Sequence, residues 1–281
     1  MKCELCPRKC GVDRGIQSGF CGAKTLKIAR VMKHFWEEPI ISGTRGSGAV
    51  FFSHCSLKCV YCQNKEISQD GKGDEITISQ LAQIFKDLEL SGVHNINLVS
   101  PTHYTNEIIS ALNIYKPKIP IVWNTSGYEE ISTIKKLRGY VDVFLTDLKY
   151  YSSEISNEYS HASNYFEKAS KAILQMRKNI PQDIIEDEIM KKGLLVRHLI
   201  LPNCASDSLK IVDWIKHNLS EKTYVSLMSQ FLPLNNCPAP INRKIKPLEY
   251  KIVMNKLLEL NFENVYVQAP TSADEKYIPK F

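Results

Sequence analysis

The chain has 281 residues, a length that fits two small domains or one large α/β barrel; 43% are hydrophobic and 23% are charged. These proportions are those of an ordinary globular protein, and a chain this long buries a sizeable core without disulfide or metal staples. The formal net charge of +6 is mild and comes with no dense Lys/Arg block, so we do not expect a nucleic-acid partner. The excess of positive charge is equally consistent with a positively charged entrance to a binding site for an anionic ligand.

The N-terminal stretch MKCELCPRKCG has no apolar run of the kind that forms a secretory signal. No stretch approaches about 18 unbroken apolar residues, so we expect no membrane-spanning helix. We therefore expect a cytoplasmic protein, and thiols stay reduced in the cytosol. The nine cysteines are an odd number, and we interpret the clustered ones as metal ligands or reactive groups rather than as disulfides.

In chain order, residues 1–25 are rich in Cys, Gly and Arg and show no hydrophobic periodicity, as expected of a small segment that is ordered by a bound metal. A glycine-rich turn over residues 43–48 leads into a short buried strand. Predicted strands span residues 49–53, 95–100, 119–127, 141–150, 193–202, 224–233 and 264–270. Predicted helices alternate with them over residues 76–92, 105–115, 129–139, 160–179, 208–219 and 247–261. Residues 180–192 are predicted to be an exposed insertion.

This alternation predicts an α/β fold with parallel strands and right-handed crossovers. The strands are nearly continuous apolar runs, as expected when both faces of a sheet are covered. We expect a partial or full parallel (β/α) barrel, with an open doubly wound sheet as the alternative. We divide the chain into a Cys-rich N-terminal extension, residues 1–42, and a barrel domain, residues 43–281.

Ligands of such barrels gather at the C-terminal ends of the strands. Polar clusters follow the predicted strands at these ends: Ser53-His54-Cys55, Ser100-Pro101-Thr102-His103, Asn124-Thr125-Ser126, Asp147-Leu148-Lys149, Arg197-His198 and Ser229-Gln230. We therefore expect one binding site at this edge of the sheet.

The stretch CSLKCVYC places Cys55, Cys59 and Cys62 together with no local fourth ligand. A structural zinc site takes four closed ligands, and an iron–sulfur cubane normally takes four thiolates. Three thiolates leave one iron open, and an open position at a metal indicates chemistry. S-adenosylmethionine, which carries its own amino and carboxylate chelating groups, is the expected occupant; the cluster then supplies one electron to break a carbon–sulfur bond.

This stretch resembles the signature of radical-SAM enzymes. CSLKCVYCQN is similar to the same region of the glycyl-radical enzyme activases, such as pyruvate formate-lyase activating enzyme, and the wider chain resembles their PflX-like branch. The matching stretches run from residue 3 to about residue 233: CELCPRKCGVDRG, EEPIISGTRGSGAVFFSHC, NINLVSPTHY, NTSGYE, VRHLILP and VSLMSQFLP. A zinc site or an inert cluster is the competing interpretation.

The resemblance implies that the three cysteines ligate a [4Fe–4S] cluster and that Tyr61 lies near the adenine of S-adenosylmethionine. Further implied contacts to this cofactor come from Asp147, Lys149 and Arg197. Asn124 stands where activases carry the Asp of an Asp-Thr pair that helps to hold a monovalent cation. The Gly-Gly-Glu turn that binds the amino group of the cofactor in activases is replaced here by Ser100-Pro101-Thr102-His103-Tyr104, in which Thr102 supplies an acceptor.

The other cysteines fall into two classes. Four close to the N-terminus are expected to bind metal: Cys3, Cys6, Cys10 and Cys21. Four thiolates with no open position favour zinc, and a second iron–sulfur cluster that relays electrons to the first is the alternative. Cys204 and Cys237 stand alone and are expected to be small buried hydrophobic residues.

The resemblance therefore implies an activase-like oxidoreductase that cleaves S-adenosylmethionine reductively to a 5′-deoxyadenosyl radical for hydrogen abstraction. The implied partners are a reductant such as flavodoxin or ferredoxin and a protein substrate, a glycyl-radical enzyme. One alternative is a radical-SAM enzyme that modifies a small metabolite or a nucleic acid. Another is a non-catalytic scaffold with zinc in both cysteine sets.

Overall fold

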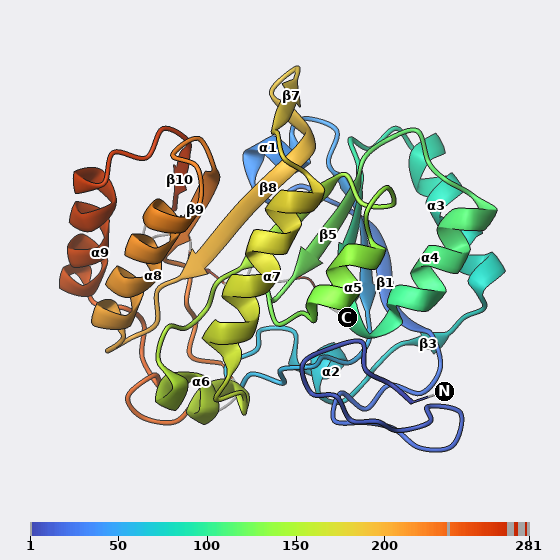
Figure 1. The fold of residues 1–281 in the computed structure, drawn as a ribbon, viewed down its shortest axis with the longest axis horizontal. Helices are drawn as coiled ribbons and strands as arrows, with labels where there is room; N and C mark the ends of the chain where they lie inside the picture. The colour runs from blue at the N-terminus through green and yellow to red at the C-terminus, as the bar shows by residue number, and fades with distance from the viewer. Residues whose placement is uncertain (1, 235–236, 269–272, 275–278, 280–281) are drawn as a thin grey trace.

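The computed structural model describes residues 2–234, 237–268, 273–274 and 279, which are built around one β-sheet (Figure 1). Its strands follow the order β10-β9-β8-β6-β5-β4-β2-β1-β3, and β7 pairs with β8. The bounds are β1 Lys27–His34, β2 Ser47–Phe52, β3 Asp74–Glu75, β4 Ile96–Val99, β5 Ile121–Thr125, β6 Val143–Asp147, β7 Ile184–Glu186, β8 Ile189–Leu199, β9 Tyr224–Met228 and β10 Val265–Val267.

Helices connect the strands and cover one face of the sheet, with α3, α4, α5, α7 and α8 in front of it in Figure 1. Their bounds are α1 Pro39–Ser42, α2 Lys65–Ser68, α3 Ile78–Leu90, the 3-10 turn η1 Thr102–Tyr104, α4 Thr105–Ile114, α5 Ile131–Lys136, α6 Ser153–Ser160, α7 Tyr165–Asn179, α8 Ala205–Asn218 and α9 Pro247–Glu259. The crossovers make six strand pairs parallel: β2–β4, β4–β5, β5–β6, β6–β8, β8–β9 and β9–β10. The α/β prediction is confirmed. Because β10 and β3 end the strand order, the described sheet is a partial barrel.

The two faces of the sheet carry separate cores. Trp123 and Phe144 are fully buried in the core that the outer helices cover. Their neighbours along the strands, Val122 and Val143, point the other way because side chains alternate in a strand, and they pack against Ile41 of α1. The short helix α1 therefore closes part of the concave face, and the remaining part is available for a site.

Helix α3 shows how local sequence sets an element. Thr77 caps its start: its hydroxyl accepts from the Gln80 amide at 3.2 Å, and the Gln80 side chain accepts from the Thr77 amide at 2.8 Å. This reciprocal pair satisfies two amides that the first turn leaves unbonded. Leu81, Phe85 and Leu88 fall on one face and are buried.

Two predicted segments differ from the structure. The helix expected over residues 160–179 begins at Tyr165, because His161 adopts a left-handed φ of 52° that ends α6 one residue earlier. The insertion at residues 180–192 is exposed as expected over Ile184–Glu186, but it is a hairpin in which β7 pairs with an extended β8. Turn residues Asp187 and Glu188, both at positive φ, close this hairpin.

The segment before the barrel is also more ordered than predicted. The strand β1 pairs antiparallel with β2 from Ile28↔Phe52 to His34↔Ser47, and α1 contacts β8. Residues 27–42, which we grouped with the Cys-rich extension, thus pack within the sheet domain. The division into two domains stays a prediction. Among the described segments, no helix combines the length and apolar character needed to cross a membrane.

Candidate active site

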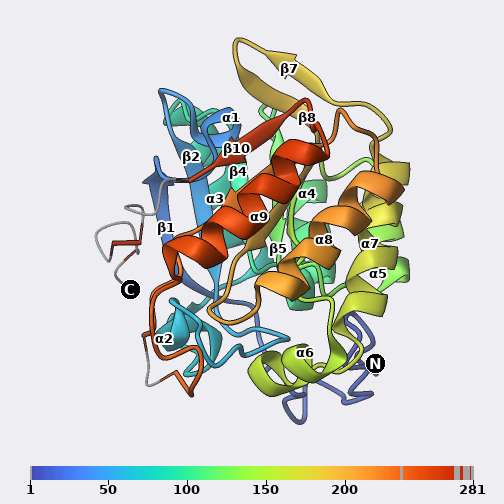
Figure 2. The same cartoon turned by 90° about the vertical axis from the view of Figure 1, so that its left-hand side faces the viewer.

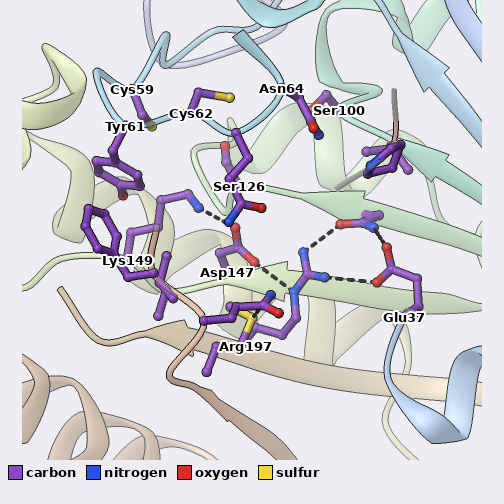
Figure 3. Close-up of a pocket in the computed structure, with 18 of the residues that line it drawn as sticks. Glu37, Cys59, Tyr61, Cys62, Asn64, Ser100, Ser126, Asp147, Lys149 and Arg197 are labelled. Atoms are coloured by element: carbon purple, nitrogen blue, oxygen red, sulfur yellow. Dashed lines mark hydrogen bonds and ion pairs between the residues drawn. The ribbon is translucent and has the colours of Figure 1, made fainter. Parts of the chain in front are cut away.

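A cavity of about 280 Å³ opens at the C-terminal ends of the strands (Figure 3). Cys55, Cys59 and Cys62 contribute one wall, and charged side chains from strand ends contribute another. Trp36, Gln230 and Phe231 also line it. The sheet therefore places these side chains where ligands of parallel α/β folds bind.

The cysteine loop leaves β2 through an abrupt change of backbone direction. His54 has a φ of 75° and Lys58 a φ of 53°, conformations that non-glycine residues seldom adopt. Each cysteine sulfur of the loop accepts a hydrogen bond: Cys55 from the Leu57 amide at 3.4 Å, Cys59 from the Ser160 hydroxyl at 2.9 Å and Cys62 from the Ser68 hydroxyl at 3.2 Å. Such bonds stabilise thiolate ligands, so the donor set fits an iron–sulfur cluster.

Without a metal, burial favours the neutral form of two of these thiols, Cys59 and Cys62. Burial raises the pKa of Cys62 to about 12. Burial also raises the pKa of Cys59, while the nearby Lys149 ammonium opposes that rise. Metal binding to this loop must therefore displace protons. Within the described residues, no three Cys, His, Asp or Glu side chains are already arranged around a single metal ion.

Arg197 organises the opposite wall through three acceptors. Its Nε donates to Asp147 Oδ1 at 2.9 Å, its Nη1 to Glu37 Oε2 at 3.0 Å and its Nη2 to Asn124 Oδ1 at 2.8 Å. Asp147 and Arg197 are register partners on β6 and β8, which brings both to the same end of the sheet. Lys149 donates to the second oxygen of Asp147 (Figure 3).

The charges of this network stabilise one another. Burial alone would raise the pKa of Asp147, but Lys149 and Arg197 outweigh it and hold that pKa below its usual value. Burial would likewise lower the pKa of Lys149, and the Asp147 carboxylate reverses this to a net rise. The network therefore stays ionised at neutral pH, which suits a zwitterionic ligand with a carboxylate and an ammonium group.

The structure brings most of the predicted site residues together. Tyr61, Asn124, Asp147, Lys149 and Arg197 all line the cavity with the cysteine loop. The hydroxyl of Tyr61 lies 2.6 Å from that of Tyr150, which fixes the ring against the cavity wall.

Thr102 is the exception, because it does not line the cavity. Ser100 takes a positive φ of 57° and faces the cavity, and the turn that follows directs Thr102 inward. The Thr102 hydroxyl donates to Glu129 Oε1 at 2.7 Å. The Thr102 side chain therefore faces a buried carboxylate instead of the cavity.

The two histidines near the strand ends have structural roles. His103 is buried, and its Nε2 lies 2.8 Å from the carbonyl of Ser53. His198 contacts the Leu148 carbonyl at 2.7 Å and the Ser208 hydroxyl at 2.8 Å, as expected of a satisfied core histidine. Burial lowers the pKa of both.

Sequence reasoning missed the acidic floor of the cavity. Glu37 and Glu38 immediately precede α1, and Glu37 also accepts from Asn124 Nδ2 at 3.1 Å. Burial raises the pKa of Glu38, and Arg197 opposes the rise. The available signal was a pair of adjacent glutamates directly before Pro39, which the pattern of strands and helices gave no reason to place inside a barrel.

The sequence profile of the Radical SAM superfamily matches residues 49–191, which include the cysteine loop and strands β2 to β6. The chain belongs to the radical SAM superfamily. This membership implies an enzyme that uses a [4Fe–4S] cluster and S-adenosylmethionine. It bears out the superfamily-level prediction; the activase branch, the N-terminal metal and the individual site residues stay predictions.

Known proteins are similar over larger parts of the chain. The uncharacterized protein MJ0674 of Methanocaldococcus jannaschii is 30% identical over 278 residues, which cover 94% of this chain and 76% of that protein. The fold is similar to that of Streptococcus suis SuiB bound to S-adenosylmethionine, with a TM-score of 0.52 and 15% identity. The match covers 76% of this chain and 48% of SuiB, so the chain spans about half the length of that structure. SuiB bound to the precursor peptide SuiA matches equally well, with a TM-score of 0.52 and 15% identity over 76% of this chain and 46% of SuiB.

Proposed function

We propose that this enzyme binds S-adenosylmethionine against a [4Fe–4S] cluster held by Cys55, Cys59 and Cys62, and cleaves it reductively to a 5′-deoxyadenosyl radical that abstracts hydrogen from a substrate. One observation carries the proposal: these cysteines and the ionised network of Arg197 line the same cavity. When bound, the cluster supplies one electron and an iron with a free coordination position. The chain's own residues then have to bind, orient and shield the cofactor.

The charged wall is suited to the amino acid end of S-adenosylmethionine. Arg197 and Lys149 offer cationic donors for its carboxylate, and Asp147 offers an acceptor for its ammonium group. Because Arg197 is already fixed by three acceptors, it loses little side-chain freedom on binding. The Tyr61 ring, which packs edge-on against Phe231 at 5.7 Å between centroids, offers an apolar surface for the adenine.

We further propose that the hydrogen abstracted is that of a glycine in a partner protein, as in the activases that the PflX-like motifs resemble. Trp36 supports a macromolecular partner, because it lines the cavity and yet is 65% exposed. SuiB, which shares the fold, has been seen with a precursor peptide. A flavodoxin or ferredoxin is the proposed electron donor, and the cytoplasm is the proposed location.

The test of the core activity is an anaerobic assay. Reconstituted protein with dithionite and S-adenosylmethionine is expected to release 5′-deoxyadenosine and methionine in equal amounts. No product from protein with a complete cluster would contradict radical formation, and a colourless anaerobic protein with zinc in both cysteine sets would favour the scaffold alternative.

The test of the target is separate. Mixing the active protein with a glycyl-radical enzyme is expected to produce a stable electron paramagnetic resonance signal from a protein radical. If 5′-deoxyadenosine forms while a panel of such enzymes stays without a signal, the substrate is of another class. Salt-sensitive binding of RNA would then favour the nucleic-acid alternative.

A further inference from the structure

The two cysteine sets share one local backbone motif. In the cysteine loop, the amide of Leu57, two residues further along the chain, donates to the Cys55 sulfur at 3.4 Å. In the N-terminal segment, the same i to i+2 arrangement serves Cys21, whose sulfur accepts from the Ala23 amide at 3.4 Å. A third sulfur, that of Cys10, accepts from the Phe20 amide at 3.3 Å. Hydrogen bonds from backbone amides to sulfur stabilise thiolate ligands of metals.

The backbone also brings the N-terminal cysteines toward one another. The Cys3 amide donates to the Val12 carbonyl at 2.9 Å and the Cys3 carbonyl accepts from the Gly11 amide at 3.0 Å, which places Cys3 beside the segment that follows Cys10. Phe20, whose amide donates to the Cys10 sulfur, immediately precedes Cys21. Gly19 gives Cys10 its space, because a Cβ at that position would lie 2.9 Å from the Cys10 sulfur. The backbone of the N-terminal segment therefore packs closely against the Cys10 sulfur.

Arg8, which lies between Cys6 and Cys10, connects this segment to the cysteine loop. Its Nε donates to the Ser56 carbonyl at 2.9 Å and its Nη2 to the Ser160 carbonyl at 2.9 Å; its Nη1 donates to the His161 carbonyl. Ser160 in turn donates to Cys59 Sγ at 2.9 Å. One guanidinium therefore holds both the loop and the helix end that supports a proposed cluster ligand.

A second contact joins the two sets directly. Gly22 follows Cys21, and His54 precedes Cys55. A Cβ on Gly22 would lie 2.9 Å from Nδ1 of His54, so the glycine lies against the imidazole ring. Both views of the fold place the N-terminal segment at the same end of the molecule as α2 and α6, the end of the sheet where the cysteine loop lies (Figures 1 and 2).

We propose that Cys3, Cys6, Cys10 and Cys21 form a second, tetrathiolate metal centre that positions the cysteine loop through Arg8 and through Gly22. The ligand is a thiophilic metal, either a zinc ion or an iron–sulfur cluster. Among the described residues, the regular structure of residues 2–26 is limited to one β-bridge, Lys2↔Asp13, and the rest of the segment has only isolated backbone hydrogen bonds. A segment with so little regular structure needs a further cross-link to hold an arginine in place. Arg8 is thus a positioning residue whose three carbonyl contacts depend on this centre.

The positioning role rests on the proposed function, since it concerns the loop that is proposed to hold the catalytic cluster. The metal itself is tested first, in a Cys55→Ser/Cys59→Ser/Cys62→Ser variant purified without oxygen. The expected result is either one zinc per chain or, for a cubane, about four irons with matching sulfide. Adding Cys10→Ser and Cys21→Ser should abolish this metal. A triple variant with no more metal than the quintuple variant would overturn the centre.

The connection is tested by the rate at which a chelator removes iron from the cysteine loop. Arg8→Met is expected to leave the N-terminal metal bound and to speed iron loss from the loop about tenfold, equivalent to about 1.4 kcal/mol. Arg177→Met is the matched control, because Arg177 makes a similar fork to Asp183, at 2.9 and 3.1 Å, outside the cysteine segments. Equal rates in Arg8→Met and wild type would contradict the connection.

A replacement variant and a parallel activity assay cover the case in which Arg8→Met does not fold. If Arg8→Met does not fold while Arg177→Met does, Gly22→Ala takes its place, and an unchanged rate of iron loss then overturns the proposal. Formation of 5′-deoxyadenosine by wild type is measured in parallel. Failure of that reaction with slow iron loss counts against the proposed function alone, whereas fast iron loss in Arg8→Met supports the positioning role in either case.

Discussion

The two cysteine-bearing segments use the same backbone turn around sulfur but differ in their surroundings. The loop with Cys55, Cys59 and Cys62 lines a cavity whose other wall carries Arg197 and Asp147. The N-terminal set has four cysteines, none of which lines that cavity, and it packs against the loop through Arg8. Ligand number and access to the cavity together therefore distinguish a proposed reactive centre from a proposed supporting one.

Loss of a loop cysteine should produce the largest effect and break the comparison most clearly. Cys59→Ser removes a proposed cluster ligand, so formation of 5′-deoxyadenosine should fall by more than about 100-fold, beyond the range typical of residues that merely support ligands. The N-terminal metal should remain, as measured by metal analysis. Retention of activity with a full iron count would show that the three-cysteine assignment is wrong.

Arg197 should be the next most sensitive position, because it is 15% exposed and its partners are buried acids. Arg197→Met leaves Asp147 and Glu37 without their shared cation and should lower the free energy of unfolding by about 3–5 kcal/mol. Binding of S-adenosylmethionine, measured by calorimetry, should weaken with it. The exposed Arg138→Met serves as control and should change stability by less than about 0.5 kcal/mol.

Glu129, a buried carboxyl outside both cysteine segments, gives a pH signature. Its Oε1 accepts from Thr102, Thr125 and Trp123, and burial raises its pKa from 4.5 to about 7. A carboxyl whose folded pKa is raised contributes stability that is complete below about pH 4.5 and declines as pH rises to about 7. The shift is equivalent to at most about 3 kcal/mol.

Glu129→Gln keeps the acceptor oxygen and removes this titration. Relative to wild type, the variant should therefore gain stability from pH 5 to pH 8, as measured by denaturant unfolding at both values. A difference between the two proteins that stays the same at both pH values would contradict the buried, titrating carboxyl.

The contact between Gly22 and His54 should give the smallest effect. Gly22 and Gly92 both have positive φ, 93° and 78°, but a Cβ on Gly92 meets nothing within 4 Å. Gly92→Ala therefore reports backbone strain alone, about 1 kcal/mol. Gly22→Ala should cost more stability and also loosen the cysteine loop. Equal unfolding free energies for the two variants would contradict a close steric contact between Gly22 and the His54 ring.

The sequence was sufficient for the parallel α/β fold and for most of the cavity, because apolar strands ended in polar residues at the edge where such folds bind ligands. Thr102 lies outside the cavity, which Ser100 with its positive φ lines instead, and local sequence does not reveal this backbone conformation. Glu37 was missed because it reaches Arg197 across 160 positions of the chain. The antiparallel pairing of β1 with β2 was also missed, because residues 27–34 were assigned to the Cys-rich extension.

The most direct test of the central claim is the electron paramagnetic resonance spectrum of dithionite-reduced protein before and after S-adenosylmethionine is added. To isolate the cysteine loop, the measurement is made on a Cys10→Ser/Cys21→Ser variant that retains the loop's iron. The cofactor is expected to change the spectrum of this cluster, since it is proposed to bind at the iron that Cys55, Cys59 and Cys62 leave free. An unchanged spectrum at saturating cofactor, with a complete cluster, would contradict it.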